Sequence, residues 1–203
     1  FAVILFFYVA LITQLAFGIA KMNKQNKSES SSPKTTFSII VPFRNEAENL
    51  PILLESFKKL NYPKELFEVI LVDDESEEKY DLRSTIYDLK IIPNQRKSNS
   101  PKKDAIETAI QIAKYNWIIT TDADCEVPKN WLQVFDTKII DTQAKMCVGS
   151  VGYKNKTGFL HDFQNNDFLS LQGVTAGSFG IEKPFMCNGA NFAYEKTFFK
   201  QLN

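Results

Sequence analysis

The sequence has few of the residues that build disulfide frameworks and zinc sites. It contains three cysteines, Cys125, Cys147 and Cys187, with no CxxC spacing and no histidine nearby. An odd number of scattered cysteines argues against a disulfide framework or a zinc site and fits a reducing compartment best. The single histidine, His161, lies among phenylalanines on an apparently amphipathic stretch, where we expect it to pack or to face solvent rather than to catalyse.

An excess of charge is also missing, because 24 Lys and Arg residues balance 24 Asp and Glu residues. No overall field therefore draws the protein to nucleic acid or to anionic lipid, and we expect no nucleic-acid partner. Any binding driven by charge must be local. The 203 residues, 44% of them hydrophobic, are enough for one domain with a sizeable core.

Charge is absent altogether from residues 1–20. About 20 apolar residues match the roughly 30 Å hydrocarbon core of a bilayer, which predicts a transmembrane helix. The alternative is a secretory signal peptide, but its apolar region is typically only about 7 to 15 residues long. Lys21, Lys24, Lys27 and Lys34 follow, and short lysine-rich flanks tend to remain cytoplasmic. We expect an anchor in the cytoplasmic membrane with the globular part facing the cytoplasm.

Residues 21–36 are rich in Ser, Lys, Asn and Thr and have one apolar side chain, Met22, so they predict a flexible polar tether. The chain begins with Phe and stops just after an apparent helix start, which leads us to expect a fragment that lacks a C-terminal part.

From residue 37 onward, short apolar runs alternate with helical patterns. Strands are expected at 37–42, 67–72, 89–92 and 117–121, with helices over 50–60 and 105–113. Beyond Trp131 the pattern weakens to an amphipathic stretch ending at 140, a strand-like segment at 148–153 and a helix over 159–171. Strands alternating with helices predict an α/β layered sheet, in which ligands bind beyond the carboxyl ends of the strands.

Two of the expected strand-ending loops carry pairs of carboxylates. Asp122 and Asp124 lie two residues apart after a buried strand, and in extended backbone such residues project to the same side. Both could then bind one Mg²⁺ or Mn²⁺, which usually takes one or two protein carboxylates together with water and substrate phosphates. Asp73 and Asp74 end the neighbouring strand and should emerge at the same edge, although a solvated acidic turn is the alternative.

A third loop is basic and leads into the helix expected at Ala105. It contains Arg96, Lys97, Lys102 and Lys103. The partial positive charge of a helix N-terminus adds to these side chains, so the loop could bind a diphosphate. A solvated basic loop with no ligand is the alternative.

The order of these features resembles a known family. The segments FSIIVPFRNEAENLPILLESFKKLNYP, FEVILVDDES, SPKKDAIETAI and WIITTDADCEVP resemble glycosyltransferase family 2. Its catalytic domain has the GT-A fold, a Rossmann-like mixed sheet flanked by helices. The resemblance covers Phe37 to Phe198 and implies a membrane-anchored, bacterial-type member with a catalytic domain over residues 37–203.

The resemblance also implies a donor pocket. Pro42, Arg44 and Glu46 would line the nucleotide pocket, and Asp74 would accept a hydrogen bond from a uracil-like base while Asp73 supports the same loop.

Lys102 would approach the donor phosphates, with Lys103 as the adjacent alternative. Asp124 would be the principal metal ligand, and Asp122 would contact the ribose or a metal-bound water. Asn188 and Gly189 belong to a segment similar to the acceptor side of the family's site, although a plain glycine turn would look the same.

The implied activity is transfer, with inversion, of a hexosyl or N-acetylhexosaminyl group from a nucleotide-sugar donor, expected to be a UDP-sugar. The acceptor would be a glycan or lipid-linked molecule of polysaccharide biosynthesis. A catalytic base is expected beyond Asn203, because no Glu-Asp or Asp-Asp pair follows the Asn188 segment. These residues alone should therefore transfer poorly.

Two alternatives remain. A nucleotidyltransferase would need a glycine-rich phosphate loop, which PFRNEAENL lacks. A membrane-anchored nucleotide-binding scaffold or pseudoenzyme would need no base.

Overall fold

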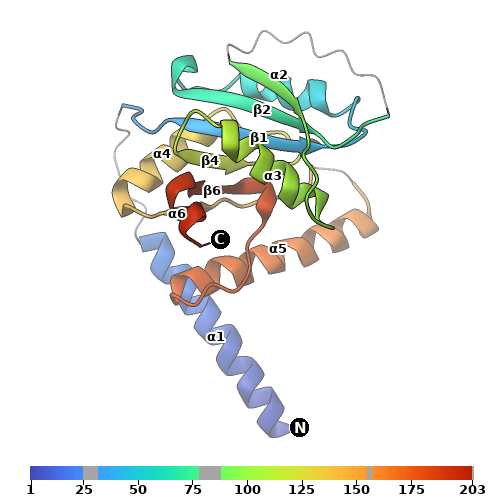
Figure 1. Cartoon of the computed structure of the whole chain (residues 1–203). Coiled ribbons are helices and arrows are strands. Elements are labelled where there is room, and N and C mark those ends of the chain that lie inside the picture. The colour runs from blue at the N-terminus through green and yellow to red at the C-terminus, as the bar shows by residue number, and fades with distance from the viewer. Residues whose placement is uncertain (25–31, 78–87, 155–156, 203) are drawn as a thin grey trace. The chain divides into compact units, whose positions relative to one another are not determined.

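The computed structural model describes residues 1–24, 32–77, 88–154 and 157–202, and its contacts divide the chain into two compact units (Figure 1). Unit 1 consists of Phe1–Glu29 and Gly149–Asn188, and unit 2 consists of Ser30–Val148 and Gly189–Asn203. This division differs from the predicted one, because residues 149–188 group with the N-terminal helix rather than with the sheet.

Unit 2 is built on one mixed sheet with the strand order β3-β2-β1-β4-β6-β5. The strands are β1 (Phe37–Phe43), β2 (Phe67–Asp73), β3 (Leu89–Pro93), β4 (Trp117–Thr120), β5 (Met146–Val148) and β6 (Phe192–Glu195). Strands β1 to β4 run parallel to one another, whereas β6 is antiparallel to both of its neighbours, β4 and β5. The mixed α/β sheet expected from the sequence is thus confirmed.

Helices cover both faces of this sheet. They are α2 (Leu50–Lys58), α3 (Pro101–Ile112), α4 (Trp131–Thr142) and the short α6 (Lys196–Gln201). Because side chains alternate along a strand, Ile39 and Val41 of β1 join the core with α2 and α4, while Ile40 joins the core with α3. Both faces of β1 are therefore buried, which explains its continuous apolar sequence.

The predicted elements match the observed ones where an apolar run fixes them. The strands at 37–42, 67–72, 89–92 and 117–121 are present to within a residue at each end. The strand over 148–153 is wrong, because β5 covers only Met146–Val148, all three paired with β6. Helix α3 begins at Pro101, before the predicted start at Ala105, since proline fits the first position of a helix.

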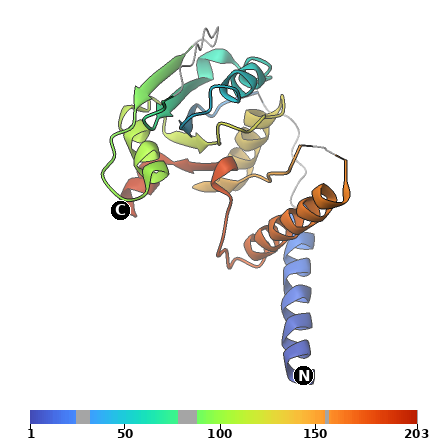
Figure 2. The same cartoon turned by 90° about the vertical axis from the view of Figure 1, so that its right-hand side faces the viewer.

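Unit 1 contains two long helices that pack against each other, α1 (Ala2–Lys24) and α5 (Phe159–Gly180). They meet at glycines: a side chain at Gly18 would overlap the backbone of Gly177, and one at Gly180 would overlap the backbone of Gly18. Helix α5 runs nine residues beyond its predicted end at 171, because its last turns are held against α1. Figure 2 shows the two helices in a second view.

Helix α1 also bears on the predicted anchor and tether. Residues Ala2–Met22 are long and apolar enough to cross a membrane, with a mean hydropathy of 2.3, which is weak support for an anchor. The helix continues through Lys24, into the predicted tether, and residues 25–31 of the tether lie outside the described part of the chain. At the C-terminal end of the predicted tether, the backbone N–H groups of Lys34 and Thr35 donate to the buried Asp136 carboxylate of α4.

Candidate donor-binding site

A pocket of about 440 Å³ opens at the carboxyl ends of β1, β2 and β4 in unit 2. Its lining residues come from those strand ends and from the start of α3: Pro42, Phe43, Arg44, Glu46, Asp74, Pro101, Lys102, Ala105, Asp122, Ala123 and Asp124. Most of the site residues named from the sequence therefore line one pocket. The named residues that do not line it are Asp73, Arg96, Lys97, Lys103, Asn188 and Gly189.

The strand register explains this convergence. Phe43 of β1 lies opposite Asp73 of β2, and Ile40 lies opposite Thr120 of β4, so all three parallel strands end at one edge. Backbone hydrogen bonds extend the register into the loops, from Asp74 N to Phe43 O at 2.9 Å and from Thr121 N to Ile40 O at 3.2 Å.

The loops after β1 and β2 are tied together by Asn45. Its backbone is left-handed, with φ of 54°, which asparagine tolerates better than most residues. Its N–H donates to Ser76 Oγ at 3.0 Å, and its Oδ1 accepts from Glu77 N at 2.8 Å. Asp73 completes the arrangement, because its Oδ1 accepts from Ser76 N at 2.9 Å. Asp73 thus lies within the loop beside the pocket without lining it.

Asp74 is buried and held by a charged partner. Arg96 donates from Nε to Asp74 Oδ1 and from Nη2 to Oδ2, both at 2.8 Å, and Asn94 Nδ2 donates to Oδ1 at 2.6 Å. These bonds, those of Arg96 above all, lower the pKa of Asp74 despite its burial. Arg96 therefore binds Asp74, whereas the sequence placed it in a loop reaching for a diphosphate. No local pattern predicts this pair, since Arg96 and Asp74 are 22 residues apart in the chain.

The conformation of the basic loop is held by Asp104, a residue that the sequence did not single out. Asp104 is 2% exposed, and its carboxylate accepts from the backbone of Lys97 and Ser98 and from Ser98 Oγ. The backbone bonds are the main reason that the pKa of Asp104 is lowered. Its place in the sequence, in the first turn of a helix and directly after a basic loop, is the pattern that could have predicted this role for Asp104.

Lys102 and Lys103 have different partners. Lys102 lines the pocket, and its Nζ lies 2.6 Å from Asp122 Oδ1. Lys103 instead pairs along α3 with Glu107 at 3.6 Å. The structure thus favours Lys102 over Lys103 as the basic residue of the pocket.

Asp122 and Asp124 reach the pocket from a turn. Strand β4 ends at Thr120, and Cys125 N donates to Asp122 O at 3.2 Å, so the extended-backbone reason given for their convergence is wrong. Asp124 is exposed, Asp122 is half-buried, and Ala123 between them is packed in the core. The turn therefore fixes both carboxylates beside the same space.

These two carboxylates suit a divalent cation that shares its ligands with a substrate. Among the described residues no cluster of three or more His, Cys, Asp or Glu could hold a metal by itself. Mg²⁺ and Mn²⁺ commonly accept one or two carboxylates and take their other ligands from water and phosphate. The pocket thus fits a metal that arrives with a diphosphate better than a permanently caged one.

Gly189 and Asn188 are not among the residues that line the pocket. Gly189 begins the 3₁₀ turn Gly189–Asn191, and its carbonyl oxygen accepts from Thr120 Oγ1 at 2.6 Å. Asn188 is the last residue of unit 1. Their acceptor-side role stays a prediction. His161 lies on α5 with its ring 6.4 Å from that of Tyr153.

Comparison with known proteins establishes the family. The model of glycosyl transferase family 2 matches residues 38–202, so the chain belongs to this family. Glycosyltransferase AglE of Haloferax volcanii is 29% identical over 140 residues, which cover 66% of this chain and 45% of AglE.

Solved structures show the same GT-A fold. Mannosyltransferase PcManGT from Pyrobaculum calidifontis, solved with GDP-Man and Mn²⁺, has a TM-score of 0.67 at 17% identity, over 100% of this chain and 58% of its own. A TarS fragment from S. aureus has a TM-score of 0.56 at 19% identity, over 83% of this chain and 49% of its own. The chain thus spans about half the length of these relatives.

Proposed function

We propose that unit 2 binds a nucleoside-diphosphate sugar together with Mg²⁺ or Mn²⁺, as the donor site of a glycosyltransferase that acts with inversion. The observation that carries the proposal is that one pocket gathers a buried carboxylate, Asp74, a lysine, Lys102, and the Asp122–Asp124 turn. These groups suit the base, the diphosphate and the metal respectively.

Asp74 is proposed to recognise the base. Its Oδ1 accepts from Arg96 and Asn94, and its Oδ2 accepts from Arg96. A carboxylate oxygen can accept from two donors, so Oδ2 could also accept from a base. Uracil and guanine both present a ring N–H that can donate to it. The UDP-sugar expected from the sequence and the GDP-Man bound by PcManGT are both compatible with this contact.

Lys102 and the metal are proposed to stabilise the leaving group. When the bond between the sugar and the diphosphate breaks, negative charge grows on the diphosphate, and a cation and an ammonium group beside it lower the barrier. Asp124 would be the principal metal ligand and Asp122 would contact the ribose or a metal-bound water. Lys102, now paired with Asp122, lies close enough to turn to the phosphates.

The remaining parts of the proposal rest on the family resemblance. The acceptor is a glycan or a lipid-linked molecule, and its hydroxyl proton is taken by a base that lies outside the donor pocket. Helix α1 anchors the protein in the cytoplasmic membrane, with unit 2 on the cytoplasmic side.

Calorimetric titration with UDP and with GDP, each with Mn²⁺ and with a chelator, tests the donor site. We expect at least one nucleotide to bind only with Mn²⁺, and Asp124→Ala to weaken that binding by at least about tenfold, the equivalent of one lost contact of about 1.4 kcal/mol. Asp162→Ala, an exposed acid of unit 1, is the matched control and should bind as the wild type does. Binding that ignores Mn²⁺ or Asp124 would favour the nucleotide-binding scaffold instead.

A further inference from the structure

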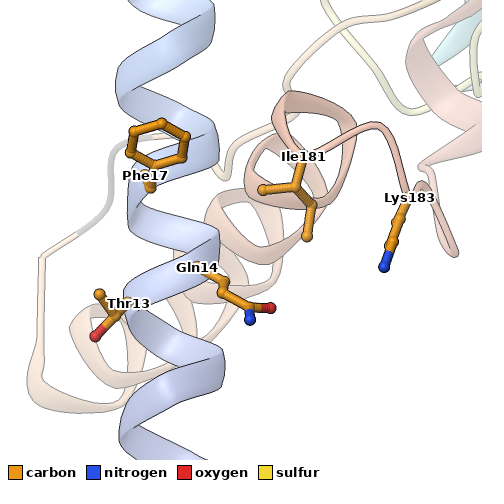
Figure 3. Close-up of a pocket in the computed structure, with 5 residues that line it drawn as sticks. All are labelled: Thr13, Gln14, Phe17, Ile181 and Lys183. Atoms are coloured by element: carbon orange, nitrogen blue, oxygen red, sulfur yellow. The ribbon is translucent and has the colours of Figure 1, made fainter.

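Unit 1 contains a second pocket, of about 430 Å³, beside the contact between α1 and α5 (Figure 3). Thr13, Gln14 and Phe17 line it from α1, and Ile181 and Lys183 line it from the end of α5 and the segment after it. None of these residues belongs to the proposed donor site. The pocket combines an amide, an ammonium group and apolar side chains.

The polar side chains that line the pocket differ in whether they have a hydrogen-bond partner. Thr13 Oγ1 donates to the carbonyl of Val9 at 2.8 Å, so it is satisfied within its own helix. Within the described residues, the structure gives no bonding partner to the side chains of Gln14 and Lys183. Gln14 lies inside the apolar stretch Ala2–Met22, where a bilayer would offer its amide no water. Polar side chains in such segments commonly mark a ligand pathway.

The depth of these groups suggests what fills the pocket. Lys183 follows Glu182, whose Oε1 lies 2.6 Å from Lys21 Nζ, so Lys183 is held near the polar end of the apolar stretch. Gln14 is seven residues before Lys21, or about 10 Å along the helix at 1.5 Å per residue. In Figure 3 the Gln14 side chain extends from α1 toward the side where Lys183 lies. With Ala2–Met22 across a bilayer, the pocket would reach from headgroup level into the hydrocarbon.

The charges indicate an anionic headgroup. Lys21 and Glu182 neutralise each other, which leaves the Lys183 ammonium as the local excess charge. An ammonium group and an amide donor suit a phosphate, while Phe17 and Ile181 suit an apolar chain. A free phosphate would leave those apolar walls uncovered, and a neutral lipid would leave the exposed Lys183 ammonium to water alone.

We propose that the pocket between α1 and α5 binds a membrane lipid phosphate, with the phosphate at Lys183, the Gln14 amide beside the linkage and the chain against Phe17 and Ile181. Such a lipid is of the chemical class that a lipid-linked acceptor would have. That identification as acceptor rests on the proposed glycosyl transfer, whereas the binding itself does not.

Native mass spectrometry of the whole chain released from detergent micelles tests the site with three probes: farnesyl phosphate, farnesol and inorganic phosphate. We expect farnesyl phosphate to be retained, and Lys183→Gln and Gln14→Leu each to weaken retention by about tenfold, as for one lost charge-assisted contact. Gln14→Leu suits an apolar helix, so a folding defect does not confuse this result. Lys200→Gln, at an exposed lysine of α6, is the matched charge control and should have no effect.

Equal retention of farnesol and farnesyl phosphate, equal retention by wild type and both pocket variants, comparable binding of inorganic phosphate, or no retention at all would each overturn the proposal. Because no nucleotide or Mn²⁺ is present, failure of the donor site would leave these results unchanged.

Discussion

At the scale of single residues, Asp74 shows how an acid can be buried in a binding pocket and stay ionised. It is 8% exposed, and burial alone would raise its pKa. The two-bond contact with Arg96, helped by Asn94, reverses that direction. The carboxylate is therefore kept as an acceptor in a fixed orientation, which is what recognition of a ring N–H requires.

Arg96→Gln tests this pair through the pH dependence of unfolding. A carboxyl group whose pKa is lowered by folding stabilises the fold above its unfolded pKa, and that stabilisation is lost as pH falls through the folded value. We expect the variant to be less stable than the wild type at neutral pH, and the difference to shrink below about pH 4, where Asp74 becomes protonated in both. Urea unfolding at both pH values measures it. Lys59→Gln, which removes an exposed pair with Glu55, is the control. A pH-independent difference would contradict the assignment.

Lys102 and Lys103 provide a matched pair for the proposed phosphate contact. They are adjacent on α3, and both are exposed, but only Lys102 lines the pocket. We expect Lys102→Gln to weaken binding of the nucleoside diphosphate by about tenfold and Lys103→Gln to leave it unchanged, since a charge-assisted bond is lost only in the first. Calorimetry with both variants decides this, and equal effects would refute the role of Lys102.

At the scale of elements, the sequence predicts what local patterns encode. The runs around Ile39, Val69 and Ile118 predict buried strands, and their ends predict where the carboxylates gather, because parallel strands share an edge. The pairing of Arg96 with Asp74 and of Lys102 with Asp122 could not be predicted, since it depends on loop conformations with no local code. Likewise, a turn rather than extended backbone brings Asp122 and Asp124 to the pocket, and the sequence did not predict that turn.

The α1–α5 contact is the clearest element that the sequence did not reveal. Gly18 of α1 is far in the chain from Gly177 and Gly180 of α5, and the three glycines form no repeat that links the two helices. Small residues let helix backbones approach closely, which is how helices associate in membranes. The same glycines would weaken an isolated helix, so helix propensity gives the opposite indication.

Gly180→Leu is expected to separate α1 from α5, because its side chain would overlap the backbone of Gly18. Overpacking of this kind typically costs about 1–3 kcal/mol, which corresponds to a roughly 5- to 160-fold larger population in which the contact is open. Amide hydrogen exchange of α5 in detergent measures that change. Gly173→Leu is the control on the same helix, since nothing lies within 4 Å of its added Cβ. Equal exchange in both variants would show that the contact does not hold α5.

At the scale of the whole molecule, the chain joins a family 2 catalytic sheet to a pair of helices that includes the candidate membrane span. The family match is continuous over residues 38–202, although the compact units divide that stretch at Gly149 and Asn188. The segment Gly149–Asn188 therefore lies within the family match but groups with α1 by its contacts.

The proposed orientation in the membrane is testable with the protein's own cysteines. Cys187 is exposed, whereas Cys147 is buried and its pKa is raised to about 11, so it should not react at neutral pH. In a Cys125→Ser background, we expect a membrane-impermeant maleimide to label Cys187 only after cells are permeabilised. Labelling of intact cells would place this segment outside.

Asp124 is proposed to hold a metal that is bound to the donor diphosphate, and the roles proposed for Lys102 and Asp122 depend on that metal. A crystal structure of the chain with Mn²⁺ and UDP or GDP, with manganese located by its anomalous scattering, tests this directly. We predict one manganese peak, bonded to an Asp124 carboxylate oxygen at about 2.2 Å and to the diphosphate. A diphosphate bound away from Asp124, or in this pocket without manganese, would contradict the account.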